Sequence, residues 1–492
     1  MLGGSETYIS TLFLDAWETD LRMCGIIGVA GVPDASRVTY LGLYSLQHRG
    51  QESAGVVAVD GAGVARAHRG MGLVSDVFSE QALADLPGDV AIGHTRYSTA
   101  GSSVLANAQP ILAGYHEGPL ALAHNGNLTN ADSLRADLVA KGSIFQTSSD
   151  SEVLIHLIAR SEAREPEDQL LDALERVEGA YSLVVTIGRT LYAIVDPRGF
   201  RPLWLGKFGE GGGYVVASET CALDLIGATP VRELEPGDFL RIQGSPPEVD
   251  KLPSLPAQPH KRCIFELVYF SRPDSTIFGR SVDRVRRALG RELAREHPAA
   301  GAACVFSVPD SSNAMALGFA EQSGLKLEHA LIRNHYVGRT FINPTQAARN
   351  AKVKIKFNPV REVLQGKKVV VVDDSLVRGT TSRELVQMIR QAGAKEVHFR
   401  VASAPITGPC YYGIDTPTKS ELIASSHSLE QIRKHLGVDT LGYLSLEGML
   451  RAAGGDHGEF CHACFSGEYP TAITDDTQRA RHSAPIQVTM AV

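Results

Sequence analysis

The sequence lacks any apolar run that approaches the roughly 20 residues of a membrane-spanning helix. It also lacks an excess of positive charge, because its 492 residues carry a formal net charge of −7 at pH 7. That balance argues against a chain that binds nucleic acid through its overall charge. Its cysteines number only seven, spread through a long chain, so a secreted disulfide framework is not expected. These absences predict a cytoplasmic protein whose partners include neither nucleic acid nor a membrane.

The first 23 residues have little of the positive charge with which a secretory signal begins. Their one basic residue is Arg22, and four acidic residues accompany it. We interpret 1–23 as a removable propeptide, or as sequence upstream of a true start at Met23. In both cases Cys24 becomes the first residue of the mature chain.

Between residue 24 and about 240, short strand-like runs alternate with glycines, as in "GIIGVAG" and "YSLVVTI". Two stretches have helical period, 36–47 and 151–178. Many strands with few helices predict sheets and helices stacked in layers. The run 244–260 contains five prolines and is predicted to be the interdomain linker. We place the first domain at 24–258.

Beyond the linker, apolar runs alternate with helical stretches, which is typical of a parallel α/β sheet. The expected strands are 303–308, 328–332, 368–374 and 396–403. The expected helices are 282–296, 312–322, 381–392 and 428–435. This second domain is predicted to span 259–470, and 471–492 is predicted to be a loose tail.

The stretch "MCGIIG" (23–28) places Cys24 directly after a methionine and ahead of an apolar run. One interpretation is a buried cysteine of the core, the usual place for a lone cysteine. The other is a nucleophile: once Cys24 is the first residue, its thiol and an α-amine that can act as base lie on one residue. The polar clusters that follow along the chain favour the nucleophile.

Those clusters are "LQHRGQESAG" (46–55), "GHTRYST" (93–99), "HNGNL" (124–128) and "SSDSEV" (148–153). Hydrolysis of a carboxamide requires a nucleophile, an acid/base, an oxyanion hole and an anchor for the rest of the substrate. Asn125 and Gly126 can offer a side-chain amide and a backbone N–H to an oxyanion. Arg96 can bind an α-carboxylate in bidentate fashion, and Asp150 can hold an α-ammonium.

With these residues in this order, the chain up to about residue 240 resembles the N-terminal-nucleophile (class II) glutamine amidotransferases. The resemblance implies a four-layer αββα fold, of the α+β class. It also implies that Cys24 attacks glutamine while its α-amine acts as the base. Asn125 and Gly126 would form the oxyanion hole, and Arg96 and Asp150 would hold the amino-acid end of glutamine.

The second strong signal is "VVVVDDSLVRGTTSREL" (369–385). Four consecutive valines predict a strand that is buried on both faces. Asp373 and Asp374 follow at its carboxyl end, where α/β sheets bind ligands. Gly379 then frees the backbone, so that the next three N–H groups can cradle a phosphate at a helix N-terminus. An ordinary strand–loop–helix crossover would explain one Asp and one Thr, but not the whole pattern.

This pattern resembles the phosphoribosyl-pyrophosphate motif of the type I phosphoribosyltransferases, whose domain is of the α/β class. The resemblance implies a substrate site formed by Asp373, Asp374, Arg378, Gly379, Thr380, Thr381 and Ser382. Ser311, in "VPDSSNA" (308–314), would help the two aspartates to bind one Mg²⁺ per subunit.

A basic segment accompanies the motif. From Leu331 to Lys368 there are nine Lys and Arg residues and a single acidic one, Glu362. A solvated basic face is the usual explanation of such a run. Beside a phosphate motif, we predict instead that 333–341 is a lid in which Arg333 and Arg339 bind pyrophosphate.

A class II glutaminase followed by a phosphoribosyltransferase is similar in arrangement to the amidophosphoribosyltransferase family, from residue 24 to 470. "CIFELVYFSRPDS" (263–275) fits that family too, whereas His335 in the lid departs from it. The resemblance implies that glutamine and phosphoribosyl pyrophosphate give phosphoribosylamine, glutamate and pyrophosphate, the committed step of purine synthesis. It also implies an internal ammonia passage that includes Tyr269, feedback inhibition by purine nucleotides, and a homodimer or homotetramer.

"CHAC" (461–464) has the commonest metal-chelate spacing, but alone it could hold zinc, form a redox pair or do neither. A subset of the resembled family carries a [4Fe–4S] cluster on cysteines in these contexts. That resemblance implies four ligands here: Cys263, Cys410, Cys461 and Cys464. The apolar surroundings of Cys221 and Cys304 predict core residues.

Two other functions are weighed against this one. Another class II amidotransferase, such as glucosamine-6-phosphate synthase or asparagine synthetase, would share the first domain but needs no ribose-phosphate loop. A ligand-sensing regulator would keep the fold and lose catalysis, yet every inferred catalytic position is retained.

Overall fold

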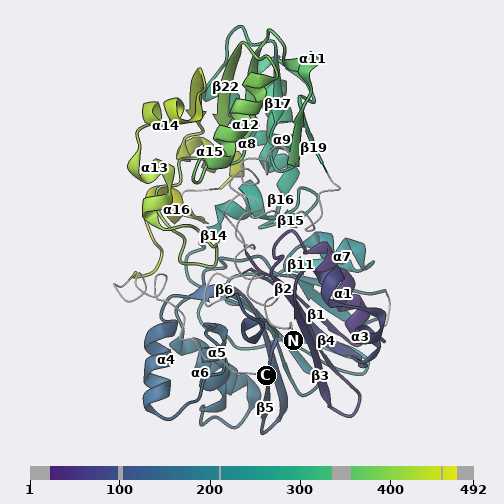
Figure 1. Cartoon of the computed structure of the whole chain (residues 1–492). Coiled ribbons are helices and arrows are strands. Elements are labelled where there is room, and N and C mark those ends of the chain that lie inside the picture. Colours follow the sequence, from purple (N-terminus) through teal and green to yellow (C-terminus); the bar gives the residue numbers. More distant parts are fainter. Residues whose placement is uncertain (1–22, 98–102, 210–211, 335–355, 456–457, 474–492) are drawn as a thin grey trace, which may run out of the picture.

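The computed structural model describes residues 23–97, 103–209, 212–334, 356–455 and 458–473, which form two stacked domains (Figure 1). Two antiparallel sheets build the N-terminal domain, and a parallel sheet builds the C-terminal domain. None of the helices in these ranges is both long enough and apolar enough to cross a membrane.

The first sheet has the strand order β11–β9–β10–β1–β4–β2–β3. Its strands are β1 (Gly25–Ala30), β2 (Ser53–Val59), β3 (Ala65–Met71), β4 (Val90–Arg96), β9 (Trp204–Lys207), β10 (Tyr214–Ala217) and β11 (Thr229–Glu233). β1 lies between β4 and β10, with Gly25 opposite Thr95 and Ile27 opposite Ala217. The residue that precedes β1 is therefore held near the middle of the sheet.

The second sheet has the order β13–β12–β8–β7–β6–β5. Its strands are β5 (Ile111–Tyr115), β6 (Gly118–Leu128), β7 (Gly179–Ile187), β8 (Thr190–Val195), β12 (Phe239–Gly244) and β13 (Pro247–Lys251). The linker predicted at 244–260 is therefore wrong for the residues of β13. Pro247 is compatible with a strand here because β13 lies at the edge of the sheet, where a missing N–H costs no ladder bond.

Side-chain alternation explains how these sheets stack. Ile26 belongs to the apolar layer between the two sheets, together with Val184 of the second sheet. Ile27 and Val29 point to the opposite face, where they pack with Leu43 of the covering helix. The two sheets thus form a sandwich with helices outside.

Helices cover both outer faces of the sandwich (Figure 1). The first sheet is covered by α1 (Ala35–Ser45), α2 (Val74–Val77), α3 (Glu80–Ala84) and α7 (Thr220–Leu225), and the second by α4 (Ala131–Ala140), α5 (Ser151–Ala159) and α6 (Pro166–Arg176). The four-layer αββα fold is confirmed. The helical stretch predicted at 151–178 is two helices, because Pro166 begins a new one at its first position. α4 was not predicted.

The sheet of the C-terminal domain is parallel, with the order β18–β17–β21–β22–β23. Its strands are β17 (Cys304–Ser307), β18 (Lys326–Leu327), β21 (Lys368–Asp373), β22 (Glu396–Val401) and β23 (Thr440–Tyr443). The four valines of β21 are fully buried, as predicted. The strand expected at 328–332 is instead β19 (Leu331–Arg333), which pairs with β20 (Phe357–Pro359) outside this sheet, because β18 already lies beside β17.

Helices cover both faces of the parallel sheet as well. Val370 and Val372 face α8 (Val282–Glu296), α9 (Asn313–Ser323) and α15 (Leu446–Ala453), whereas Val369 and Val371 face α11 (Arg361–Leu364), α12 (Thr380–Gln391) and α14 (Leu429–Leu436). The predicted α/β class and its four expected helices are confirmed. Smaller elements are α13 (Ile423–Ser426), α16 (Ala463–Ser466), β14 (Arg262–Cys263), β24 (Phe460–Cys461), β15 (Thr276–Ile277) and β16 (Arg280–Ser281).

One hydrophobic core crosses the junction between the domains. Ala180 and Phe200 of the first domain, and Met23 just before it, belong to the same buried cluster as residues of the second. The rings of Phe200 and Tyr412 stack with their centroids 4.5 Å apart. The same cluster includes residues of η3 (Glu266–Phe270), a single π-helical turn that follows β14 early in the second domain. The two domains are therefore packed as one body at the junction.

Candidate active sites

Cys24 lies directly before β1 and is buried, with 6% of its surface exposed. Its Sγ lies 3.5 Å from the carbonyl oxygen of Tyr97, just after β4. Burial raises the pKa of the thiol to about 11, although the Tyr97 contact opposes that shift. The thiol is therefore protonated at neutral pH and needs a base before it can attack.

Three charged residues surround this thiol. Arg96, Glu52 and Asp150 all act on it electrostatically. Nη1 of Arg96 donates to Oε1 of Glu52 at 2.7 Å, and both side chains are buried, which fixes the direction of the guanidinium. Asp150 directly precedes α5, and its Oδ2 accepts a hydrogen bond from the N–H of Leu128 at 3.0 Å. The structure thus brings Cys24 together with both predicted glutamine anchors.

Asn125 and Gly126 lie near the end of β6. Among the described residues, neither Nδ2 nor Oδ1 of Asn125 has a hydrogen-bond partner, although both atoms are buried. An unpaired buried amide is costly and is commonly explained by a ligand that completes it. A Cβ on Gly126 would lie 2.0 Å from the carbonyl oxygen of Ala180, so the backbone can follow this path only with glycine. An open amide beside an obligatory glycine fits an oxyanion hole.

The second domain contacts this part of β6. Gly413 lies so close that a Cβ on it would be 2.7 Å from the carbonyl carbon of Gly126. Beside it, Nδ2 of Asn127 donates to the carbonyl oxygen of Tyr411 at 3.0 Å. The segment 411–413 therefore braces β6 close to Asn125.

The phosphate motif lies at the carboxyl end of β21, as predicted. Asp373 ends the strand, and α12 begins at Thr380 after a short loop. Gly379, with a φ of 76°, is the N-cap of α12, and no side chain caps this helix. Its first N–H groups therefore lack intrahelical partners and can bind an anion.

Asp373 and Asp374 are both buried. Burial raises the pKa of both carboxyls, and the charge of Asp374 raises that of Asp373 further. The Oγ of Ser312 donates to Asp373 at 3.3 Å, and the side chain of Ser311 hydrogen-bonds Asp374. In the described part of the chain, Oδ2 of Asp374 has no hydrogen-bond partner. An adjacent buried acid pair with an open oxygen fits a cation such as Mg²⁺.

Two of the arginines that are predicted to bind the substrate form ion pairs with acidic residues. Nη1 of Arg333 lies 2.8 Å from Asp310, and Nη2 of Arg378 lies 3.0 Å from Glu421. Residues 335–341 of the predicted lid, including Arg339 and His335, lie outside the described residues.

Four cysteines gather at the domain junction. β14 and β24 pair in parallel and place Cys263 opposite Cys461. Cys464 follows on α16, and its carbonyl oxygen accepts the N–H groups of Thr407 and Gly408, which lead to Cys410. Burial raises the pKa of Cys263 to about 11, although the charge of Arg201 opposes this shift. Cys461 and Cys464 shift in the same direction, first by burial and then by the other thiols.

No group of three or more His, Cys, Asp or Glu side chains in the described ranges is arranged to hold a metal ion, and this includes these four thiols. The two cysteines predicted to be core residues, Cys221 and Cys304, are buried.

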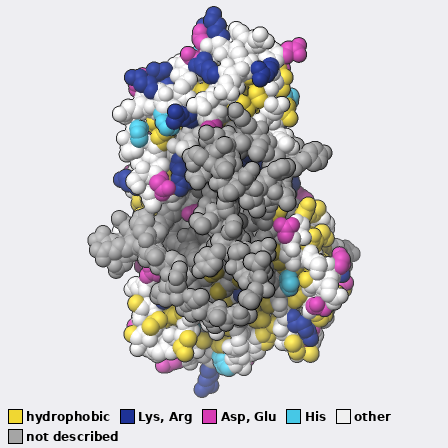
Figure 2. Space-filling view, viewed as in Figure 1, with side chains coloured by type: hydrophobic (Ala, Val, Ile, Leu, Met, Phe, Trp, Pro, Cys, Tyr) yellow, Lys and Arg dark blue, Asp and Glu magenta, His cyan; other side chains and the backbone are white. Residues whose placement is uncertain are grey.

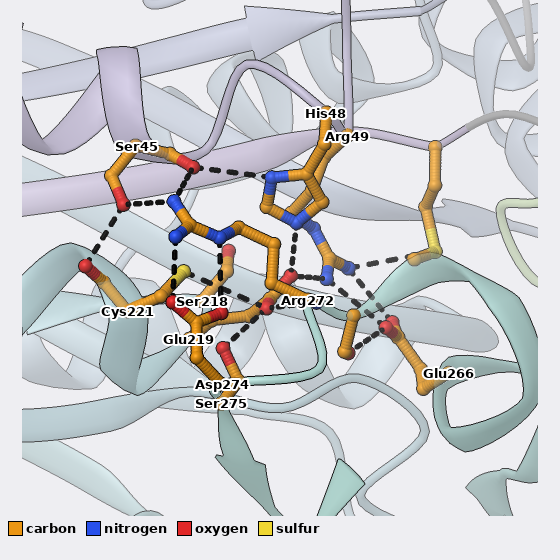
Figure 3. Close-up of polar contacts among 12 residues, drawn as sticks. Ser45, His48, Arg49, Ser218, Glu219, Cys221, Glu266, Arg272, Asp274 and Ser275 are labelled. Carbon is orange, nitrogen blue, oxygen red and sulfur yellow. Dashed lines mark hydrogen bonds and ion pairs between the residues drawn. The ribbon is translucent and has the colours of Figure 1, made fainter. Parts of the chain in front are cut away.

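Some residues near the sites had no role in the sequence analysis. Arg49 and Glu52 lie in the polar cluster 46–55, which signalled function without showing which residues matter. Figure 3 shows Arg49 between Glu219 and Glu266, which come from different domains. Nothing local in the sequence pairs these three residues.

Comparisons with known proteins cover both domains. Residues 94–225 match the family described as glutamine amidotransferase domain. The amidophosphoribosyltransferase of Bacillus subtilis (strain 168) is 50% identical over 459 residues, which are 92% of this chain and 95% of that protein. A solved structure of glutamine phosphoribosylpyrophosphate amidotransferase from B. subtilis, complexed with ADP and GMP, has a TM-score of 0.87 at 48% identity and covers 94% of this chain and 100% of its own. Another, described as the allosteric regulatory enzyme of purine biosynthesis, has a TM-score of 0.87 at 49% identity and covers 92% and 97%.

Proposed function

The chain belongs to the amidophosphoribosyltransferase family, and from that premise we infer that it transfers ammonia from glutamine to phosphoribosyl pyrophosphate. The products are 5-phosphoribosylamine, glutamate and pyrophosphate, in the first committed step of de novo purine biosynthesis. One observation carries this conclusion: the 50% identity extends over 92% of the chain and therefore over both domains. A glucosamine-6-phosphate synthase, an asparagine synthetase or a silent regulator does not account for it.

The reaction is tested by following glutamate and pyrophosphate together. We expect one pyrophosphate for each glutamate when both substrates are present, and pyrophosphate alone when ammonia replaces glutamine. Phosphoribosyl pyrophosphate should also stimulate glutamine hydrolysis, because the family couples its two sites. Glutamate formed without any pyrophosphate would contradict the transfer.

We propose the following roles in the first domain. Cys24 attacks the carboxamide carbon of glutamine after 1–23 has been removed, and its α-amine takes the thiol proton. The Nδ2 group of Asn125 and the N–H of Gly126 stabilise the oxyanion. Arg96 binds the α-carboxylate and Asp150 the α-ammonium. The unpaired buried amide of Asn125 supports this assignment.

In the second domain, the open N-terminus of α12 would bind the 5-phosphate of the substrate through residues 379–382, with Arg378 beside it. Asp373 and Asp374 would hold the ribose hydroxyls or, with Ser311, position Mg²⁺. The metal would supply charge that neutralises the departing pyrophosphate. Arg333 and Arg339 would bind that pyrophosphate from the lid.

The brace between the domains leads to a selective prediction. Gly413→Ala would push a methyl group into Gly126 and displace the oxyanion strand. We expect the kcat for glutamine to fall about 10-fold or more, because small displacements of reacting groups are expensive. Ammonia-dependent synthesis should change little.

The matched control for this variant is Gly437→Ala. Gly437 also has a positive φ, of 74°, but a Cβ there meets nothing within 4 Å. Gly437→Ala therefore measures the effect of placing alanine at a positive φ when the added methyl group contacts nothing. An equal loss of both reactions in Gly413→Ala would contradict a brace that serves the glutaminase.

We also propose a [4Fe–4S] cluster on Cys263, Cys410, Cys461 and Cys464. The supporting observation is that the four thiols act on one another electrostatically, while the buried positive charge of Arg201 acts on three of them, Cys263, Cys410 and Cys461. Bound there, the cluster would join 407–416 to β14 and β24. Its role would be structural, with sensitivity to oxygen as a consequence.

Cys464→Ser is expected to lose iron and sulfide together, along with visible absorbance, when the protein is purified without oxygen. Removal of one of four thiolates leaves the remaining ligands unable to hold the cluster. Cys304→Ser, which changes a buried thiol away from the junction, should keep the iron content of the wild type. Zinc in place of iron in the wild type would contradict the cluster.

We propose that purine nucleotides inhibit this enzyme, since the B. subtilis structure is complexed with ADP and GMP.

We further propose a homodimer or homotetramer in the cytoplasm. Hydrophobic side chains lie at the surface near α1 and α7 (Figure 2), where Leu41, Tyr44 and Leu225 are exposed. Surfaces of this kind are typical of subunit contacts.

A further inference from the structure

Arg49 touches the main chain of the proposed nucleophile. It is fully buried, and its Nε donates to the carbonyl oxygen of Cys24 at 2.8 Å. Nη2 also lies 3.8 Å from the sulfur of Met23, a contact that ends once 1–23 is removed. The bond to the Cys24 carbonyl is therefore the contact through which Arg49 can orient the mature N-terminus.

Two buried carboxylates hold the guanidinium in place (Figure 3). Nη1 donates to Oε1 of Glu219 at 2.6 Å, and Glu219 belongs to the first domain. Nη1 and Nη2 donate to the two oxygens of Glu266 at 3.0 and 2.8 Å, and Glu266 opens η3 of the second domain. Burial opposes the charge of Arg49, but the two carboxylates outweigh it and raise the pKa of the guanidinium. Arg49 thus remains charged and is oriented from both domains.

The turn that carries Glu266 is itself fixed from the transferase side. Arg286 of α8 donates to the carbonyl oxygens of Leu267, Tyr269 and Ser271 at 3.1, 2.7 and 2.7 Å. The same guanidinium interacts electrostatically with Asp374 of the phosphate motif. The turn that carries Glu266 is therefore held by an arginine that also senses the charge of Asp374, which relates the phosphate motif to the residue that orients Arg49.

We propose that Arg49 is a positioning residue for the Cys24 nucleophile and that Glu266 makes this positioning depend on the transferase domain. The proposal rests on the assigned role of Cys24. Arg49 touches neither glutamine anchor in these contacts, so it acts on the placement of the attacking group rather than on substrate binding. An arginine bound to carboxylates of the first domain alone would be held as rigidly, but its position would not depend on the second domain.

Arg49→Lys and Glu266→Gln test this without leaving a bare cavity. Lysine keeps one charge but cannot reach both carboxylates and the carbonyl together, because its ammonium lacks the planar fork of arginine. We expect the kcat for glutamine to fall about 100-fold in Arg49→Lys and about 10-fold in Glu266→Gln, with little change in KM. Ammonia-dependent synthesis should be retained, and the stimulation of glutamine hydrolysis by phosphoribosyl pyrophosphate should weaken in Glu266→Gln.

Glu233→Gln is the matched control. Its carboxylate also accepts hydrogen bonds across the junction, from the N–H groups of Phe278 and Gly279 at 2.6 and 2.9 Å, but in a different place. It should leave the kcat for glutamine unchanged. The double variant Arg49→Lys/Glu266→Gln should lose less than the product of the two single losses, since both remove one arrangement.

Parallel loss of the glutamine and ammonia reactions in Arg49→Lys, or a selective glutamine defect in Glu233→Gln, would overturn the proposal. Fully multiplicative losses in the double variant would overturn the link between Arg49 and Glu266. Failure of the underlying assignment looks different: Cys24→Ser would then still use glutamine.

Discussion

Cys24→Ala is expected to abolish the use of glutamine, lowering its kcat by about 10⁴-fold or more. The thiol is the only group of this side chain that can form the acyl intermediate. Synthesis from high concentrations of ammonia should persist, because the acceptor site needs only NH₃. The measurement is glutamate and pyrophosphate release with each nitrogen donor.

Both proteins should be compared as chains that begin at residue 24, with the start verified by intact mass. A loss of activity then cannot result from a failure to remove residues 1–23. Cys304→Ala is the control, because Cys304 is a buried thiol of β17 without a proposed role. Normal use of glutamine by Cys24→Ala would refute the nucleophile.

Asp373→Asn is expected to lower synthesis from glutamine and from ammonia alike, by about 100-fold. The substitution removes a charge that a Mg²⁺–pyrophosphate substrate requires. Because burial and the neighbouring charge already disfavour the ionised form, asparagine should not lower the thermal unfolding temperature. Activity is measured with each donor, and unfolding by calorimetry.

Asp439→Asn provides the comparison on the same sheet. Asp439 directly precedes β23 and is ion-paired with Arg390 near the surface, away from the carboxyl end of β21. Its loss should leave both reactions intact. If Asp373→Asn impaired only the glutamine-dependent reaction, the assignment of the phosphate site would be contradicted.

The sequence predicted those elements whose burial pattern is contained in a short stretch of the chain. The valines of β21 and the helical period of α8 were enough, because a continuous apolar run predicts a strand buried on both faces and a 3.6-residue period predicts a helix with one buried face. β13 was missed because prolines were interpreted only as a linker, although an edge strand tolerates them. The division of 151–178 had a signal in Pro166 that was not used.

The sites divide in the same way. Asp373, Asp374 and Gly379 are consecutive or nearly so, and the strand places them without further help. The roles of Asn125 and Arg96 came from resemblance, since a short polar cluster alone resembles a turn. The pairing of Arg49 with Glu266 spans 217 residues and crosses two domains, so no periodicity or spacing could reveal it.

The central place of β1 has a consequence for synthesis on the ribosome. The strand that follows the nucleophile is made first, yet its N–H at Ile26 is bound by Ser218, 192 residues later. Domains form as the chain emerges from the ribosome. The edge of β1 that pairs with β10 therefore has no partner strand until β10 has been translated. Glu266 emerges later still. In a nascent chain the thiol of Cys24, the proposed nucleophile, therefore lies outside an assembled site until most of the first domain has been made.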